Sequence, residues 1–523
     1  MSAPFGSTRA AGSMVASADG LATQAGMAIL AQGGNAVDAA IACNAAIAVT
    51  SPHLCGMGGD LYALIHDGVG VHALNATGRA GAGSSASQLR AEGHQQMPFR
   101  HDIRTVTVPG CVDGWTALHQ RFGRLPMAQV LAPAIRLAEL GFPASPLLVG
   151  VLAVLDARAR DALSEIVEQA TQPGSRVCRP GAARALRSIA EHGRDGFYLG
   201  EFGEGLGRLG DGLFSESDLS VPGGTWVNPL SREVFGTTLH TMPPNSQGYL
   251  LLAAAGLAEQ LDLPGDTQSE HWAHLLIEAA KAVGFDRPTV LHDAADGNAL
   301  LEAAALRLNT VDRDIATRRA VPALDGDTTY LCVVDDQRMG VSLIQSNASN
   351  FGSWLVEPST GINLHNRGLG FSLEPNHPAE LAQGKRPPHT LSPAMATNAD
   401  GSLAAVFGTM GGDGQPQILL QLAARIFHHG QSPAAAVHAA RWVLSGPATG
   451  FDTWTAPQGP HVLVEGHAAA NWREALEARG HTVRVIAPYD SAFGHAHAIV
   501  VEPTGMLCGA ADPRCRVGSV AGA

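Results

Sequence analysis

The stretch DGDTTYLCVVDD, residues 325–336, changes abruptly from turn-forming to strand-forming residues. Asp and Gly are depleted from strands and favour turns, whereas Thr, Tyr and Val fit a pleated, half-buried surface. We therefore expect a strand to begin at Thr328. This start has two interpretations. Thr328 is either an ordinary first residue of a strand, or it becomes a chain terminus when the peptide bond between Asp327 and Thr328 is cut.

A terminal threonine has chemistry that an internal one lacks. Its hydroxyl is a weak nucleophile at neutral pH and needs a neighbouring base. A free α-amino group, with a reference pKa of about 7.7 to 8.0, can accept the hydroxyl proton near physiological pH. Cleavage before Thr328 would therefore give one residue both the nucleophile and the base.

A glycine-rich loop follows a predicted strand in FGTMGGDGQPQ, residues 407–417. The strand is expected to end near Thr409, and Gly411 and Gly412 follow it directly. Adjacent backbone N–H groups that no side chain obstructs suit an oxyanion hole. A Gly-Gly pair is more often a simple turn, so the loop is interpreted as an oxyanion hole only in combination with other motifs.

The rest of the chain mixes apolar helical patterns with short strand patterns. Residues 21–49 are typical of two alanine-rich helices separated by the GGN run at 33–35, and both should pack deep in the molecule. Helical patterns dominate residues 115–194. After Thr328, strands alternate with helices, one of them predicted over 433–444. Helices before and after strands joined by hairpins predict an α/β sandwich with central sheets and helical outer layers.

Composition excludes several classes of function. The chain of 523 residues has a net charge of -13 and no run of Lys or Arg, so nothing favours nucleic acid or an anionic membrane surface. Its seven cysteines include no C-x-x-C pair, and no phosphate-binding G-x-x-x-x-G-K-[ST] motif occurs. The first residues lack the apolar segment of a signal peptide. We expect a soluble cytoplasmic protein without cofactor or metal.

Several motifs, taken in order, resemble the γ-glutamyltransferase family of self-processing N-terminal nucleophile hydrolases, including its branch with cephalosporin acylases and oxamate amidohydrolase. The motifs are MVASADGLATQAGMAILAQGGNAVDAAIACNAAIAVTSPHLCGMGGD, TVPGCVDGW, TMPPNSQGYLLL, DTTYLCVVDD, VSLIQSNASNFGSW, PSTGINLHNRGLGFSL, GKRPPHTLSPAM and GTMGGDGQPQ. The resemblance covers nearly the whole chain. It implies a four-layer αββα sandwich built from two fragments of one precursor. Residues 1–327 would form the large subunit and 328–523 the small subunit, intertwined in one globular unit.

The resemblance also implies roles for individual residues. Thr328 is the expected nucleophile, and Ser346 falls where the family places a second hydroxyl that assists processing. Gly411 and Gly412 match the oxyanion glycines. Arg79 falls at the arginine that grips the substrate α-carboxylate.

The sequence departs from the family pattern around the expected substrate. Gly370 stands where glutathione-cleaving members carry an acidic residue for the substrate ammonium. His389 and Thr390 replace two serines, and Arg367 replaces a neutral polar residue. A pocket that loses an anion and gains a guanidinium suits a carboxylate-bearing acyl group. Asp413 could restore the lost charge, so γ-glutamyl compounds stay open as substrates.

We therefore expect an amidohydrolase or acyltransferase that cleaves a small-molecule amide through an acyl-enzyme, with water or an amine as acceptor. One alternative is an oxamate or glutaryl/cephalosporin-type amidohydrolase without γ-glutamyl activity. Another, of a different class, is an unprocessed and inactive binding protein. Expected partners are the substrate, the acceptor and the two fragments of the precursor, with no nucleic acid and no membrane. A homodimer of processed units is left open.

Overall fold

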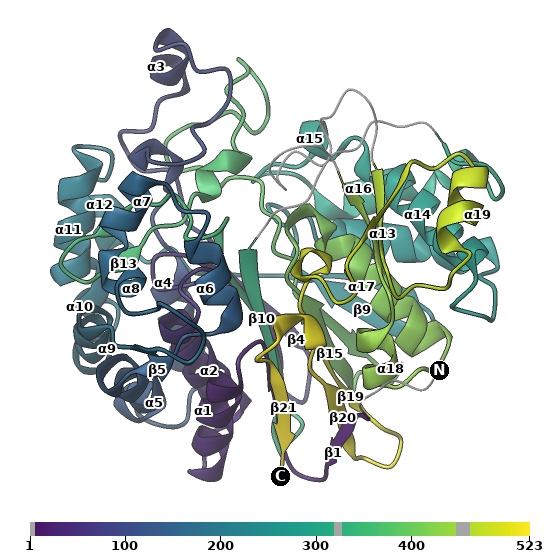
Figure 1. The fold of residues 1–523 in the computed structure, drawn as a ribbon, viewed down its shortest axis with the longest axis horizontal. Coiled ribbons are helices and arrows are strands. Elements are labelled where there is room, and N and C mark those ends of the chain that lie inside the picture. Colours follow the sequence, from purple (N-terminus) through teal and green to yellow (C-terminus); the bar gives the residue numbers. More distant parts are fainter. Residues whose placement is uncertain (1–5, 318–326, 446–460) are drawn as a thin grey trace.

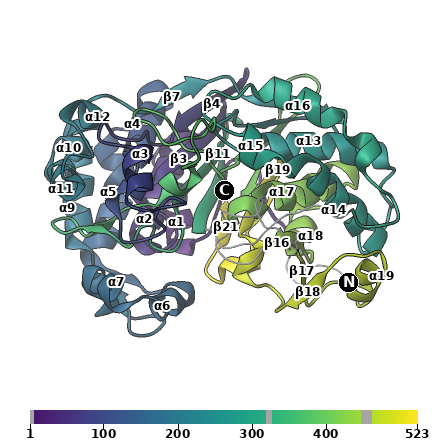
Figure 2. The same cartoon turned by 90° about the horizontal axis from the view of Figure 1, so that it is seen from above.

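Two seven-stranded antiparallel sheets lie face to face between two layers of helices (Figures 1 and 2). This computed structural model describes residues 6–317, 327–445 and 461–523. The layers form the four-layer αββα sandwich that the resemblance implied. None of the helices in these ranges is long and apolar enough to cross a membrane.

The first sheet, sheet A, has the strand order β1-β20-β19-β15-β14-β9-β8. Its strands are β1 (Thr8–Ala10), β20 (Leu507–Ala510), β19 (Ala496–Val501), β15 (Leu403–Thr409), β14 (Ala394–Thr397), β9 (Thr237–Thr241) and β8 (Leu230–Val234). Sheet B has the order β21-β2-β10-β11-β3-β4-β7. Its strands are β21 (Ser519–Gly522), β2 (Met14–Ser17), β10 (Asp327–Val334), β11 (Gly340–Ala348), β3 (Asp60–His66), β4 (Val71–Ala76) and β7 (Thr225–Val227).

Different helices cover the outer faces of the two sheets. Sheet B carries α1 (Gly20–Ala31), α2 (Ala36–Thr50), α4 (Cys111–Phe122), α5 (Met127–Leu140) and α9 (Pro180–His192). Sheet A carries α13 (Tyr249–Ala258), α14 (Glu270–Gly284), α17 (Gln415–Ala423) and α18 (Pro433–His438). In Figure 1 the sheet-B helices lie on the left and the sheet-A helices on the right.

Shorter elements complete the two sides. The remaining helices are α3 (Ala86–Ala91), α6 (Pro146–Leu152), α7 (Ala157–Ala162), α8 (Ser164–Val167), α10 (Asp195–Tyr198), α11 (Glu201–Gly210), α12 (Glu216–Ser220), α15 (Arg287–Val290), α16 (Gly297–Ala305) and α19 (Trp472–Ala478). Small sheets pair β5 (Phe142–Pro143) with β6 (Arg176–Val177), β12 (Val356–Glu357) with β13 (Ile362–Asn363), and β16 (Trp442–Ser445) with β17 (His461–Glu465) and β18 (Val483–Ile486).

Alternation along β10 shows how one strand serves two cores. Leu331 and Val333 face the helices over sheet B, whereas Tyr330 and Cys332 belong to the apolar layer between the two sheets. Successive side chains of a strand point to opposite faces, so a strand buried on both sides is apolar throughout. This explains why the predicted strand after Thr328 is almost continuously apolar.

The two alanine-rich helices form as predicted. Asn35 caps α2: its side chain accepts from the backbone of Val37 and Asp38, and Asp38 accepts in return from the Asn35 backbone. Gly33, at φ +89°, provides the left-handed turn between α1 and α2. Every residue of α2 is buried, which explains why its side chains are small or apolar on all sides.

Two predictions about local structure need comment. The helix predicted over 433–444 is wrong in its second half: α18 ends at His438, and Trp442–Ser445 forms β16. Periodicity cannot separate a short apolar strand from a buried helix, and pairing with β17 decides the matter. The predicted turn residues Asp325 and Gly326 lie outside the described residues.

Two close contacts between the sheets fix how β10 lies over β15. A Cβ on Gly408 would lie 2.2 Å from the Tyr330 ring, and one on Gly340 would lie 2.6 Å from Leu403. Gly340 pairs with Val334 at the far end of β10. The two strands therefore run in opposite directions, and Thr328 and the glycine loop after β15 lie at the same edge of the sandwich.

We predict that Gly408→Ala lowers the free energy of unfolding by about 1–3 kcal/mol, because the added methyl group must push the Tyr330 ring away. The displaced strand would also carry Thr328 away from the glycine loop. Chemical denaturation and a turnover assay measure the two effects. The control is Gly207→Ala in α11, where nothing lies within 4 Å. It should leave stability unchanged or raise it, and equal behaviour of both variants would contradict the packing argument.

Candidate active site

Thr328 lies at a break in the sheet. Asp327 pairs with Ala348 and Thr329 with Gln345, so Thr328 alone lies opposite two residues, Ser346 and Asn347, which form a bulge in β11. Bulges bend a strand and re-aim a side chain, and they are common beside active sites. Thr328 is only 1% exposed, and its Oγ1 donates a hydrogen bond to Ser346 Oγ at 3.0 Å.

Ser346 collects several donors on one oxygen. Besides Thr328 Oγ1, its Oγ accepts from Ala348 N at 2.8 Å and from Arg367 Nη2 at 3.0 Å. One of these donors is a full positive charge, and hydrogen bonds to charged groups are the stronger ones. These bonds hold Ser346 Oγ beside Thr328 Oγ1 and place a positive charge next to the two hydroxyl groups.

Arg367 is a buried guanidinium at the centre of this network. Its Nη1 donates to Thr390 Oγ1 at 2.9 Å. Burial lowers the pKa of Arg367 to about 10, while the nearby Asp60 and Asp413 carboxylates oppose that shift. Arg367 therefore stays charged at neutral pH in a site from which water is largely removed.

Gln247 connects this network to the glycine loop. Its Nε2 donates to Thr390 O at 2.9 Å and to Gly412 O at 3.0 Å. Gly411, at φ +133°, and Gly412, at φ +50°, have backbone conformations that favour glycine. Hydrogen bonds hold both carbonyl groups of the loop: Gly412 O accepts from Gln247 Nε2, and Gly411 O accepts from Gly414 N at 2.8 Å. Sequence reasoning did not single out Gln247, although it lies in the TMPPNSQGYLLL motif.

His389 joins the site through Asp60. His389 Nδ1 accepts from Leu391 N at 3.2 Å, so the ring proton resides on Nε2, which donates to Asp60 Oδ2 at 3.2 Å. Burial, together with the Arg367 charge, lowers the pKa of His389 to about 3. His389 is therefore neutral at physiological pH and acts as a hydrogen-bond donor.

Asp60 is a second member of the network that sequence reasoning did not single out. Burial alone would raise the pKa of its carboxyl group, but His365, His389 and Arg367 together lower it to about 2. Its Oδ1 accepts from Gly78 N at 2.9 Å, and its backbone pairs with Ser346 in the sheet. The available signal was a lone carboxylate between a glycine loop and an apolar strand in GMGGDLYALI.

Two other predicted residues have partners outside this network. Arg79 is half-exposed, donates to Gly384 O at 2.9 Å and lies 3.6 Å from the Asp293 carboxylate. Asp413 is fully buried and lies 3.3 Å from the Arg287 guanidinium. Among the described residues, the structure thus brings together Thr328, Ser346, Arg367, Thr390, His389 and the glycine loop, with Asp413 beside them and Arg79 further out.

Gly370 is closely packed. A Cβ at this position would lie 2.3 Å from Pro388 O. Pro388 directly precedes His389, so the segment that carries His389 and Thr390 closes over the backbone of Gly370. This packing leaves no room for a side chain at position 370 unless segment 387–388 moves.

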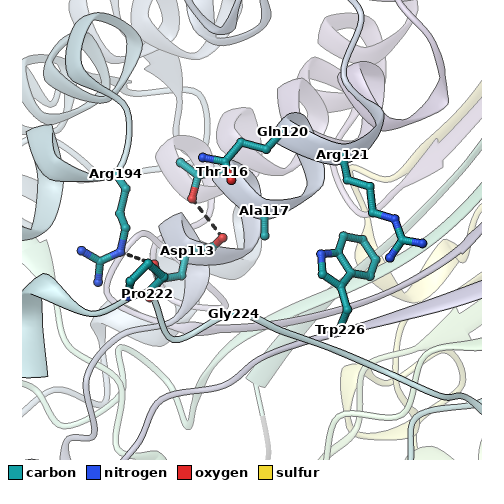
Figure 3. Close-up of a pocket in the computed structure, with 9 residues that line it drawn as sticks. All are labelled: Asp113, Thr116, Ala117, Gln120, Arg121, Arg194, Pro222, Gly224 and Trp226. Carbon is teal, nitrogen blue, oxygen red and sulfur yellow. Dashed lines mark hydrogen bonds and ion pairs between the residues drawn. The ribbon is translucent and has the colours of Figure 1, made fainter.

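A cavity of about 320 Å³ lies elsewhere, between α4 and the segment that leads into β7 (Figure 3). An ion pair of 2.6 Å joins Arg194 and Asp113 at one side, and Arg121 and Trp226 lie at the other. Of the described residues that line it, none belongs to the Thr328 network. This cavity is therefore separate from the Thr328 network.

The αββα sandwich, with a threonine as second residue of an inner strand beside another hydroxyl and a glycine loop, defines the class of N-terminal nucleophile hydrolases. Residues 22–523 match the family model described as Gamma-glutamyltranspeptidase. The chain belongs to this family, whose named members are hydrolases and acyltransferases.

Three relatives show the range of the family around this chain. It is 35% identical to the glutathione hydrolase-like YwrD proenzyme of Bacillus subtilis, over 96% of this chain and 97% of that one. It is 36% identical to the oxamate amidohydrolase proenzyme of Klebsiella pneumoniae, with the same coverage of both chains. Cephalosporin acylase from Bacillus halodurans has a similar structure, with a TM-score of 0.90, 33% identity and coverage of 100% and 98%.

We predict that Asp60→Asn is less stable than the wild type by about 2 kcal/mol at pH 7, from a carboxyl pKa lowered from 3.8 to about 2. Because the folded-state pKa is depressed, this stabilisation is present above pH 4 and is lost as the pH falls towards 2. The gap between wild type and variant should close over that window in urea denaturation. Asp262→Asn, at an exposed carboxylate, is the control. A gap that stays constant from pH 7 to pH 2 would contradict the electrostatic assignment.

Proposed function

We propose that the protein is a self-processing amidohydrolase that uses Thr328 as its nucleophile and acts on small amides with a carboxylate-bearing acyl group. The observation that carries the proposal is the buried hydrogen bond from Thr328 Oγ1, directly after the Asp327–Thr328 bond, to Ser346 Oγ, which lies in a bulge of β11 and is held by Arg367. Membership of a family whose curated relatives are called proenzymes supports it.

Self-cleavage would begin with Thr328 Oγ1 attacking the carbonyl carbon of Asp327. The C–O bond forms, the C–N bond breaks, and the Thr328 nitrogen takes up the proton that the hydroxyl gives up through Ser346. Water then hydrolyses the ester, which leaves a carboxylate on Asp327 and a free amine and hydroxyl on Thr328. The products are chains of 327 residues and 523 − 327 = 196 residues.

Turnover would use the same oxygen. The freed α-amino group accepts the Oγ1 proton as Oγ1 attacks the substrate amide carbon. The N–H groups of Gly411 and Gly412 stabilise the oxyanion, and the proton passes to the departing amine when the C–N bond breaks. Water or a second amine attacks the resulting ester, releases the acyl group and returns the proton to Oγ1.

The charges of the site favour an acyl group that carries a carboxylate or oxo group. Arg367 donates to the hydroxyl groups of Ser346 and Thr390, so its positive charge lies beside Thr328, where an anionic acyl group would be bound. Asp60 and Asp413 already face His389 and Arg287. Likeness to an oxamate amidohydrolase and a cephalosporin acylase supports this choice. Arg79 is proposed to attract anionic substrates from its more exposed position.

A second candidate is γ-glutamyl hydrolysis or transfer. Two buried carboxylates, Asp60 and Asp413, lie close enough to Arg367 to affect its pKa, and either could receive a substrate ammonium. The relative named glutathione hydrolase-like supports this candidate.

We predict that Thr328→Ala abolishes both fragment formation and turnover, because it removes the attacking oxygen. Thr328→Ser should retain both at reduced rate. Denaturing gel electrophoresis of fresh and incubated protein follows the fragments, and mass determination fixes their termini. Thr329→Val is the matched control, since the neighbouring hydroxyl is buried and has no hydrogen-bond partner among the described residues. Fragments of 327 and 196 residues in the alanine variant would refute the proposal.

We also predict that the wild type releases amine from oxamyl and glutaryl amides faster than from γ-glutamyl amides. Arg367→Gln should lower kcat/KM on the anionic acyl groups by roughly 30-fold to 1,000-fold, the effect of losing a buried charge partner. A neutral acetyl amide should lose clearly less. Arg425→Gln, at a buried arginine that contacts Thr267, controls for general destabilisation. An equal loss on every acyl group would contradict recognition by Arg367, and preference for γ-glutamyl amides would favour the second candidate.

A further inference from the structure

A second buried polar cluster combines residues that come well before Thr328 in the sequence with one that comes well after it. It consists of His274, Glu278 and Lys281 on α14, with His481 between α19 and β18. All four are almost completely buried. The helix α14 precedes the Asp327–Thr328 bond in the chain, whereas His481 follows it.

The hydrogen bonds of this cluster have one consistent direction. Lys281 Nζ can only donate, so His481 Nδ1 accepts from it at 3.2 Å. The His481 proton is then on Nε2 and is donated to His274 Nδ1 at 2.8 Å. His274 in turn donates from Nε2 to Asp312 O at 3.2 Å. Both rings are neutral in this arrangement, which agrees with the lowered pKa that burial and the Lys281 charge give His481.

The same cluster holds Thr317, the last residue of the described range 6–317. Glu278 Oε2 accepts from the Thr317 backbone N at 3.1 Å and also from Thr317 Oγ1. Lys281 donates to Thr317 O at 3.3 Å and to Glu278 Oε1 at 2.8 Å. Each of the three Lys281 N–H groups thus has an acceptor, and Thr317 is bound through its N–H, its C=O and its hydroxyl.

Residues after Thr328 hold the other side of the 312–317 segment. Ala316 N donates to Arg479 O at 2.7 Å, and Arg479 Nη1 donates to Asp314 O at 3.1 Å. Segment 312–317 therefore lies between α14 and the turn after α19. If the chain is cut before Thr328, these contacts join one fragment to the other.

The three groups His274, Glu278 and His481 also place ligand atoms within 4.8 Å of one another, a distance that a metal ion could span. A metal would need lone pairs on both His274 Nδ1 and His481 Nε2, which now share one proton. If His481 Nε2 gave up its proton to bind a metal, the neutral ring would carry its proton on Nδ1 instead. That N–H group would then face the Lys281 ammonium, which is also a donor. The cluster is therefore better suited to binding the chain than to binding a metal.

We propose that His274, Glu278, Lys281, His481 and Arg479 form a clamp that anchors segment 312–317. The clamp positions the chain ahead of the Asp327–Thr328 bond for scission and afterwards ties the two fragments together. These are positioning residues, and their role in scission rests on the self-processing proposed above. The anchor lies 328 − 317 = 11 residues before the nucleophile in the sequence.

The test compares Thr317→Val, Thr317→Ser and Thr310→Val in the full-length precursor. Thr317→Val removes the hydroxyl that donates to Glu278, whereas Thr317→Ser keeps it. Thr310→Val is the matched control, because its hydroxyl bonds only to Arg307 O within the described residues. Scission is followed by denaturing gel. Anchoring is followed by thermolysin cleavage at Ile315, whose side chain is exposed at the surface.

Thr317→Val should slow scission and speed cleavage at Ile315 by about tenfold each, the effect of losing a hydrogen bond to a charged group. Thr317→Ser and Thr310→Val should stay within about twofold of the wild type, as should the melting temperature of all three. Unchanged scission in Thr317→Val overturns the positioning role, and unchanged thermolysin cleavage overturns the anchor.

Two further outcomes separate this inference from the proposed function. If the wild type never cleaves itself, the proposed function fails, while thermolysin cleavage of the precursor still decides whether segment 312–317 is clamped. Elemental analysis for zinc in protein purified without chelator gives the last readout. Less than one tenth of an equivalent supports the clamp, and one zinc per chain that is lost in His481→Gln overturns it.

Discussion

The hydroxyl of Ser346 is the group on which the rest of the site depends. It accepts from Thr328 Oγ1 on one side and from the buried Arg367 guanidinium on the other. A buried cation must be compensated, and Asp60 and Asp413 supply the opposite charge at a short distance. Thr328 therefore lies in a region of paired buried charges, where electrostatic interactions are stronger than in water.

The fold makes that arrangement from both parts of the chain. In sheet B, β10 and β11 lie between β2 and β3, so strands from after Thr328 are flanked by strands from before it. Asp60 on β3 stands beside Ser346 on β11, and Gln247 links Thr390 to Gly412. Cutting one peptide bond in such a structure would not separate the parts, because the hydrogen-bonded ladder and the apolar cores cross the cut.

The surroundings of Gly370 depend on packing as much as on residue identity. That position 370 is a glycine is visible in the sequence, but its close packing is visible only in space, where Pro388 O closes over Gly370. The segment that closes over it also carries His389 and Thr390. Gly370 and segment 387–390 therefore pack as one unit, and a larger side chain at 370 would require that segment to move.

Local pattern determined the strand that begins at Thr328, the two capped alanine-rich helices and the glycine loop, because turn chemistry and side-chain period are properties of neighbouring residues. The order of motifs also pointed to Ser346, Arg367 and His389. Tertiary structure alone decided that Asp60 and Gln247 complete the network and that 442–445 is a strand. It also placed His481 against α14. These contacts join residues far apart in the chain. Their free energy comes from burial and from hydrogen bonds between distant segments, which a short stretch of sequence does not contain.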